Sequence, residues 1–255
     1  MQILHITDPH LYGRADGKLR GVETDSSLRA VLDDAFQHMP EYAAILVTGD
    51  LVQDDPDGYL RFRSIFGSMR QPVLCIPGNH DEPEAMQREL AGAPFQIGGT
   101  HAIGGWQFIM LDSYEAGEVG GRLTEGELAR LDAALSVTDA PALVCLHHHP
   151  VVMGSLWLDT VGLANPAEFW RIIDAHPAVR AVVWGHVHQV YDGHRGRVRL
   201  LATPSTGAQF LPGSDRYAVD PRPPAYRRLE LFADGRIETA VNWIDAKTLP
   251  QAAAR

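Results

Sequence analysis

Side chains of the kinds that bind metal ions gather in five short stretches of the sequence. These stretches are Asp8-Pro9-His10, Gly49-Asp50, Gly78-Asn79-His80-Asp81, His147-His148-His149-Pro150 and Gly185-His186-Val187-His188. They offer oxygen and nitrogen atoms and no thiolate. Such ligands suit Mn, Fe, Zn or Co better than they suit a soft metal. Together they predict a metal centre, provided that the fold brings them to one place.

Each stretch follows a run of residues typical of a buried strand. The predicted strands are residues 3–7, 43–48, 72–76, 107–111, 141–146, 181–184 and 197–201, with a final pair at 228–232 and 237–241. Predicted helices lie between them at 26–38, 57–68, 83–90, 124–135 and 166–175. This alternation indicates an α/β fold. In open α/β sheets the ligand crevice lies outside the carboxyl ends of the strands, which is where the metal-type side chains are expected.

Taken singly, the stretches are weak signals. An aspartate after a strand is often a helix cap, and Asp81 followed by Glu82-Pro83 also fits a plain helix start. Asp81 is alternatively a hydrogen-bond partner for a ligating imidazole. The pair His186 and His188 is a stronger signal because residues i and i+2 of an extended segment point to the same side. The five stretches in this order make coincidence improbable.

The three consecutive histidines pose a separate question. Neighbouring side chains of a strand point to opposite faces, so His147, His148 and His149 are not all expected at one point. At most one or two of them are predicted to share a site.

Length and composition indicate a single α/β domain spanning residues 1–255, in which 203–250 form a C-terminal loop and terminal strand pair. The net charge of −10 argues against a nucleic-acid partner, because polyphosphate binding depends on Lys and Arg. No apolar run approaches the roughly 20 residues of a membrane span. With no secretory signal pattern at the N-terminus, a cytoplasmic location is expected.

With these five stretches the sequence resembles the calcineurin-like metallophosphoesterases, whose signature runs D-x-H, G-D, G-N-H-[DE], a histidine and G-H-x-H. Two further stretches, L-R-G-V-E-T at 19–24 and T-P-S-T at 203–206, are similar to the bacterial class III phosphodiesterases that hydrolyse 3′,5′-cyclic AMP. The resemblance implies a four-layer α-β-β-α sandwich of two mixed sheets. It also implies hydrolysis to 5′-AMP by a hydroxide that bridges two metal ions.

The resemblance assigns roles residue by residue. One ion is expected on Asp8, His10, Asp50 and His188, and the other on Asp50, Asn79, His148 and His186. His80 is the expected catalytic residue, which stabilises the transition state or protonates the leaving 3′ oxygen. Substrate contacts are expected from Asn79, His80, His149 and Thr206, and His147 is expected to be structural.

Two departures from the family pattern concern the substrate. Glu23 stands where asparagine is expected, and Gly207 stands where many relatives carry cysteine. The expected partner is a small phosphodiester, and a homodimer remains open. The alternatives are a related enzyme for glycerophosphodiesters or 2′,3′-cyclic nucleotides, and a non-enzymatic scaffold of the same fold.

Overall fold

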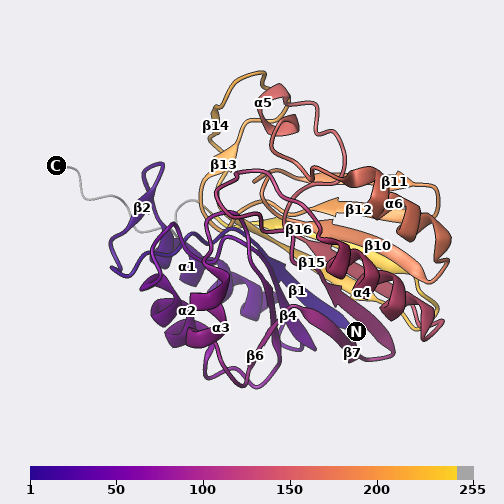
Figure 1. Cartoon of the computed structure of the whole chain (residues 1–255). Helices are drawn as coiled ribbons and strands as arrows, with labels where there is room; N and C mark the ends of the chain where they lie inside the picture. The colour runs from indigo at the N-terminus through magenta and orange to yellow at the C-terminus, as the bar shows by residue number, and fades with distance from the viewer. Residues whose placement is uncertain (246–255) are drawn as a thin grey trace.

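The computed structural model describes residues 1–245 and contains two six-stranded sheets packed face to face. Helices cover the outer face of each sheet, so the layers run helix, sheet, sheet, helix (Figure 1). The predicted four-layer sandwich of two mixed sheets is confirmed.

The first sheet has a parallel core and an antiparallel edge pair. Its order is β16 (Ile237–Trp243), β15 (Ala225–Leu231), β1 (Gln2–Ile6), β4 (Ala44–Thr48), β5 (Val73–Ile76) and β6 (Phe95–Ile97). Strands β1, β4, β5 and β6 are parallel, and β15 runs antiparallel to both β1 and β16. The parallel strands therefore end at one edge of the sheet.

The second sheet also has a parallel core. Its order is β11 (Tyr191–Arg195), β12 (Val198–Ala202), β10 (Val179–Trp184), β9 (Ala142–Leu146), β8 (Trp106–Met110) and β7 (Gly99–Ile103). The four central strands are parallel, and β11 and β7 are antiparallel edges. Leu146 of β9 and Trp184 of β10 are paired at the ends of their strands.

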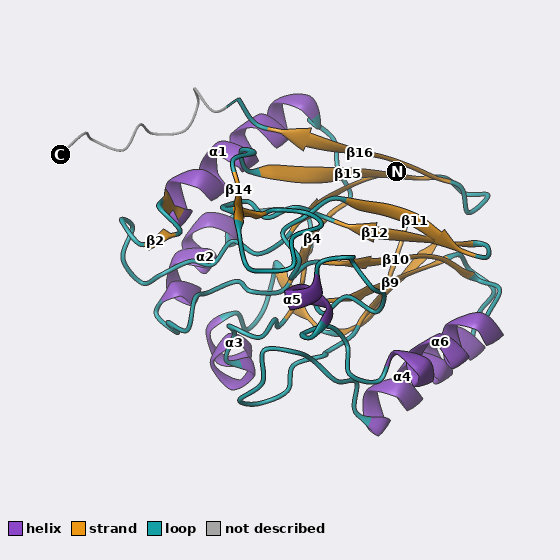
Figure 2. Cartoon of the chain, turned by 90° about the horizontal axis from the view of Figure 1, so that it is seen from above, coloured by secondary structure: helices purple, strands orange, loops and turns teal. Residues whose placement is uncertain are grey.

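The helices divide between the two outer faces. The first sheet is covered by α1 (Thr24–His38), α2 (Gly58–Phe66) and α3 (Pro83–Glu89), and the second by α4 (Glu125–Ser136) and α6 (Pro166–Ala175), as the view from above shows (Figure 2). Side chains alternate between the two faces of each strand, so they fill three apolar layers. One layer lies between the two sheets, and one lies between each sheet and its helices. In β1, Ile3 faces the other sheet, whereas Leu4 and Ile6 face the helices.

The predicted strands and helices are all present, with boundaries shifted by at most three residues. The sequence patterns missed the edge strands β6, β7 and β11, the short pairs β2 (Lys18–Leu19) with β3 (Val22–Glu23) and β13 (Gln209–Phe210) with β14 (Val219–Asp220), and the one-turn helix α5 (Leu156–Asp159). The predicted C-terminal segment 203–250 contains β13 to β16, and its last five residues lie outside the described part. Within residues 1–245, no helix has the length and apolar character needed to cross a bilayer.

Candidate metal centre

The ends of five parallel strands meet at one edge of the sandwich and bring the metal-type side chains together. Asp8, Asp50 and Asn79 follow β1, β4 and β5 of the first sheet, and the histidines at 147–148 and 186–188 follow β9 and β10 of the second. The carboxylates and imidazoles are almost fully buried. Each sheet therefore supplies half of the cluster, and the face-to-face packing closes it.

One part of the cluster contains Asp8, His10 and His188. The Nε2 atom of His188 lies 3.2 Å from Asp8 Oδ1 and 3.1 Å from His10 Nε2. His188 Nδ1 lies 2.7 Å from the carbonyl oxygen of Ala208. A carbonyl only accepts, so Nδ1 carries the proton and Nε2 presents its lone pair to Asp8 and His10.

The other part is built on Asp50 and His147. His147 Nε2 lies 3.4 Å from Asp50 Oδ2 and 3.3 Å from Asn79 Oδ1, while its Nδ1 donates to the carbonyl of Thr48 at 2.7 Å. Asp50 Oδ2 also lies 3.7 Å from His10 Nε2. Asp50 is thus shared between the two parts.

His147 and His148 offer ligand atoms to one candidate metal group, which agrees with the expected limit of one or two of the three consecutive histidines. Strand β9 ends at Leu146, so the alternation that would separate the side chains does not extend to residues 147–149. All three rings lie near His186, with centroid distances of 5.0 Å for His147, 4.8 Å for His148 and 5.7 Å for His149. His147, which was expected to be structural, is the one that faces Asp50 and Asn79.

The chemistry of the donor set fits metal ions. Lone pairs of His147 Nε2, Asn79 Oδ1 and Asp50 Oδ2 face one another, and such an arrangement is repulsive unless a proton or a cation lies among them. The Nε2 atom of His186 is buried without a hydrogen-bond partner among the described residues. His147, His148 and His186 form one group whose candidate ligand atoms lie within 4.8 Å of one another, and Asp8, His10 and His188 form another.

The pKa values of the cluster follow from burial and mutual charge. Burial lowers the pKa of His10 from 6.5 to about 3 and also lowers that of His186. Burial opposes a charge on His147 too, but the Asp50 carboxylate outweighs it and raises the His147 pKa to about 9. Burial likewise opposes the charge on Asp50, yet His147 holds the Asp50 pKa well below 3.8. Without a bound cation, a protonated His147 is the positive partner of the Asp50 carboxylate, at the position where a metal ion would take its place.

Backbone strain is concentrated at the same place. Within the described residues, seven that are not glycine have a left-handed φ: Asp8, His10, Arg20, Asp50, Asp54, His186 and His188. Such conformations cost free energy and persist where the surrounding structure enforces them, as at functional sites. Five of the seven belong to the cluster itself.

Gly49 shows why a glycine precedes a clustered aspartate. Its φ is +98°, and a Cβ there would collide with His147 Nδ1 and approach Gly78 N. The absence of a side chain lets β4 turn sharply into Asp50 while His147 packs directly on the turn.

His80 stands at the mouth of the centre beside Asp50. Its backbone N–H donates to Asp50 Oδ1 at 2.9 Å, and its Nδ1 lies 3.0 Å from Asp54 Oδ1 and 2.8 Å from Gln53 Nε2. His80 is partly exposed, whereas the clustered imidazoles are buried. Asp54 and Gln53 were not identified from the sequence, although Asp54 lies only four residues after Asp50.

Asp81 has neither of the two roles expected for it. Its carboxylate accepts hydrogen bonds from Gly78 N at 2.9 Å, Leu51 N at 3.1 Å and the Tyr59 hydroxyl at 2.8 Å. Burial, together with the charge of Asp50, raises its pKa to about 7. Asp81 thus joins the loops that follow β4 and β5, and Glu82, not Asp81, precedes α3.

A cavity of about 240 Å³ opens onto the cluster. His10, Asp50, Asn79, His80, His186 and His188 line it together with Leu19, Arg20, Gln53, Val119, Trp157, Leu158, Val161, Phe210 and Tyr217. His149 and Thr206, expected at the substrate, are buried and do not line this cavity. Thr206 instead hydrogen bonds through its backbone, donating to Thr7 O at 3.2 Å and accepting from Ser27 Oγ at 2.5 Å.

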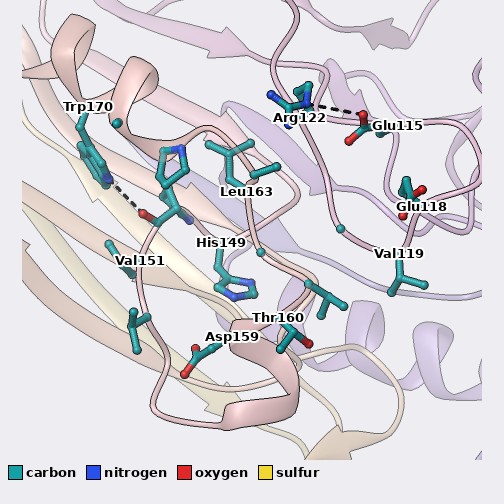
Figure 3. A pocket seen from close by; sticks show the side chains of 18 of the residues that line it. Glu115, Glu118, Val119, Arg122, His149, Val151, Asp159, Thr160, Leu163 and Trp170 are labelled. Carbon is teal, nitrogen blue, oxygen red and sulfur yellow. Dashed lines mark hydrogen bonds and ion pairs between the residues drawn. The ribbon is translucent and has the colours of Figure 1, made fainter.

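His149 lines a second, wider groove of about 1320 Å³. Asp159, Thr160 and Leu163 lie around it there, and Trp170 donates to the carbonyl of Pro150 (Figure 3). The wider groove adjoins the cavity that holds Asp50 and Asn79, since Val119 and Val161 line both, but neither Asp50 nor Asn79 lines the groove.

The two departures from the family pattern are accommodated locally. The Glu23 carboxylate pairs with Lys18 Nζ at 3.1 Å across the β2–β3 pair. Gly207 N donates to Ser205 Oγ at 2.8 Å, and a Cβ at Gly207 would meet only that hydroxyl, at 3.5 Å. Glu23 does not line the cavity.

Comparison with known proteins gives consistent matches along the chain. It is 39% identical over 245 residues to 3′,5′-cyclic adenosine monophosphate phosphodiesterase CpdA of Pseudomonas aeruginosa, covering 95% of this chain and 90% of that protein. It is 38% identical over 260 residues to the protein of the same name in Escherichia coli (strain K12), covering 100% and 94%.

A solved structure supports the fold alone. The crystal structure of a dimetal phosphatase from Danio rerio aligns with a TM-score of 0.64 and 14% identity, over 96% of this chain and 99% of that one.

Residues 1–190 match the family model described as calcineurin-like phosphoesterase. This match, which covers every clustered aspartate and histidine, shows that the chain belongs to the calcineurin-like phosphoesterase family.

Proposed function

We propose that this protein hydrolyses 3′,5′-cyclic AMP to 5′-AMP at a dinuclear metal centre. The observation that carries the proposal is the cluster around Asp50, which opens onto a small cavity and contains every ligand type that two divalent ions need. The substrate is inferred from the relatives, which are named cyclic AMP phosphodiesterases and align with nearly the whole chain. A cytoplasmic location fits a small intracellular nucleotide and stays part of the proposal.

One ion is proposed to bind Asp8, His10, Asp50 and His188, as the sequence suggested. For the other ion, the proposed ligands are Asp50, Asn79, His186 and His147. His147 replaces His148 in this set because His147 Nε2 faces Asp50 and Asn79, while its Nδ1 proton is held by the Thr48 carbonyl. His148 makes a hydrogen bond through Nδ1 to Ser113 Oγ at 2.8 Å and packs on His186, which suits a supporting role.

The donor set limits the metals without selecting one. Imidazole and carboxylate ligands suit Mn, Fe, Zn and Co, which compete by availability as well as by affinity. Two such ions, when bound, supply the positive charge that activates water and neutralises phosphoryl oxygens. Ligating imidazoles are held in place by the carbonyls of Thr48 and Ala208, which fix which nitrogen is free.

His80 is proposed as the residue that handles the leaving group. It lies at the cavity wall next to Asp50, and it is partly exposed, so a substrate oxygen has access to its ring. A protonated imidazole there donates a proton to the departing 3′ oxygen of the ribose. Nδ1 donates to the Asp54 carboxylate at 3.0 Å, which leaves Nε2 directed away from Asp54.

A substrate panel tests the proposed function. The protein, reloaded with Mn²⁺ after chelation, is incubated separately with 3′,5′-cyclic AMP, 2′,3′-cyclic AMP and glycerophosphocholine, and products are separated by chromatography. We expect kcat/KM to be highest for 3′,5′-cyclic AMP, with 5′-AMP as the product. Preference for either of the other diesters would retain the metal chemistry and overturn the substrate.

A further inference from the structure

Three aromatic side chains form one wall of the cavity that opens onto the metal-type cluster. Trp157 comes from α5, Phe210 from β13, and Tyr217 from the loop between β13 and β14. Their ring centroids lie 5.2 to 5.3 Å apart in pairwise edge-to-face contact. Phe210 also stacks on His188 with a centroid distance of 4.0 Å and an interplanar angle of 6°. The aromatic wall therefore begins at the cluster itself.

Arg20 extends this wall from a different part of the chain. Its guanidinium lies 4.7 Å above the Tyr217 ring, so it links the β2–β3 turn to the loop after β13. Arg20 is the one Lys or Arg among the described residues that line this cavity. A guanidinium on an aromatic face attracts electron-rich planar groups as well as anions.

Trp157 carries a hydrogen-bond donor with no acceptor. Its Nε1 is buried and unpaired within residues 1–245, as is that of Trp184, but Trp157 alone of the two lines the cavity. By contrast, Trp106 Nε1 donates to Phe232 O and Trp170 Nε1 to Pro150 O, both at 2.9 Å. A buried unpaired N–H is unfavourable unless a ligand or water satisfies it.

We propose that Trp157, Phe210, Tyr217 and Arg20 form the subsite for the nucleobase. The purine ring packs on the aromatic wall, and Trp157 Nε1 donates to an acceptor atom of the base. This inference rests on the proposed function and deepens it, because it assigns substrate choice to side chains that hold no metal. A glycerol group has no aromatic face, and the Arg20 guanidinium on the wall repels the choline cation, so the subsite favours a nucleotide over such diesters.

Binding of 5′-AMP compared with ribose 5-phosphate tests the subsite without relying on turnover. The two probes share the phosphate and the sugar and differ in the base, so the ratio of their Kd values cancels contacts at the metal centre. Calorimetry on Mn²⁺-loaded protein is expected to give at least tenfold tighter binding of 5′-AMP. Trp157→Phe, which keeps the ring and removes the donor, should reduce this ratio about fivefold.

Tyr217→Leu and Trp170→Phe complete the design. Tyr217 is 40% exposed, so Tyr217→Leu should fold normally and reduce the ratio about tenfold. Trp170 lines the wider groove, so Trp170→Phe should leave the ratio unchanged. Equal binding of the two probes by the wild type, or a ratio that changes only in Trp170→Phe, overturns the subsite.

The same proteins distinguish this inference from the proposed function. Failure to hydrolyse 3′,5′-cyclic AMP, with the expected pattern of Kd ratios, would refute the proposed activity and support the subsite. Hydrolysis of cyclic AMP with no effect of Trp157→Phe or Tyr217→Leu on the ratio would support the activity and refute the subsite.

Discussion

The Asp54 carboxylate lies 3.0 Å from His80 Nδ1 and connects an exposed, strained loop residue to the ring beside Asp50. Asp54 has a φ of +49°, a conformation that costs free energy in a residue other than glycine. Under the proposed role of His80, its orientation by Asp54 gives this strain a use in catalysis. By lying beside Nδ1, the Asp54 carboxylate leaves Nε2 as the ring nitrogen that can face a leaving group.

This contact predicts that Asp54→Asn lowers kcat for cyclic AMP about tenfold with little change in KM. The loss should be small for bis(p-nitrophenyl) phosphate, because p-nitrophenolate leaves without a proton. Steady-state kinetics on both substrates provide the check, with the exposed Asp57→Asn as the matched control. Equal losses on the two substrates would contradict a role for Asp54 through proton donation.

The geometry of the three histidines predicts different metal contents for single variants. His147→Ala should lose one of two metal equivalents, since His147 Nε2 faces Asp50 and Asn79. His148→Ala should retain more metal than His147→Ala. His149→Ala, which affects the wider groove, should retain both ions. Metal analysis by mass spectrometry after dialysis decides between them. A deficit in His148→Ala with full occupancy in His147→Ala would restore the ligand set suggested by the sequence.

Gly49 predicts a steric penalty at the turn before Asp50. Gly49→Ala should destabilise the protein by about 2–4 kcal/mol, because the new Cβ has an unfavourable φ and collides with His147. Gly92→Ala is the matched control, since Gly92 has a φ of +85° but nothing within 4 Å of its Cβ position. Urea unfolding should show a clearly smaller loss for Gly92→Ala. Equal losses would mean that the contact with His147 contributes nothing.

His5 predicts a pH dependence of stability. Its ring is fully buried between the sheets, with Nε2 at 2.9 Å from Thr48 Oγ1 and Nδ1 at 2.8 Å from Thr203 Oγ1. Burial, with the nearby charge of Arg227, lowers its pKa from 6.5 to about 3. The folded pKa lies below the unfolded one, so between pH 6.5 and 3 the unfolded state binds more protons and stability falls as pH falls.

His5→Gln removes this titration while keeping a neutral polar side chain. Between pH 6 and 4, the free energy of unfolding of the wild type should fall by about 1.4 kcal/mol per pH unit more than that of the variant. Above pH 7 the two slopes should coincide. Parallel slopes across the acid range would show that His5 is not buried as a neutral ring.

The sequence predicted the parts of the molecule that depend on local patterns. Apolar runs identified the central strands, and Asp8, Asp50, Asn79 and His186 follow strand ends, where an α/β sheet collects its ligands. The edge strands β7 and β11 were missed because half-exposed Gly, His and Arg side chains replace the apolar run.

Other features depend on where the chain turns and on contacts between distant segments. The predicted strand 141–146 ends at the correct residue, but the run A-L-V-C-L-H-H-H does not show how the backbone turns at residues 147–149 and where it places His147. Asp54 was missed because nothing in its neighbourhood indicates contact with His80. Arg20 and Tyr217 meet across almost 200 residues, and no spacing rule joins them.

Metal removal and reloading test the central claim most directly. Wild-type protein and Asn79→Ala are stripped with a chelator, reloaded with Mn²⁺ and assayed for conversion of 3′,5′-cyclic AMP to 5′-AMP. The proposed centre predicts that stripping abolishes turnover, that Mn²⁺ restores it in the wild type, and that Asn79→Ala remains at least a hundredfold slower. Full turnover by stripped protein, or by Asn79→Ala, would contradict catalysis at this centre.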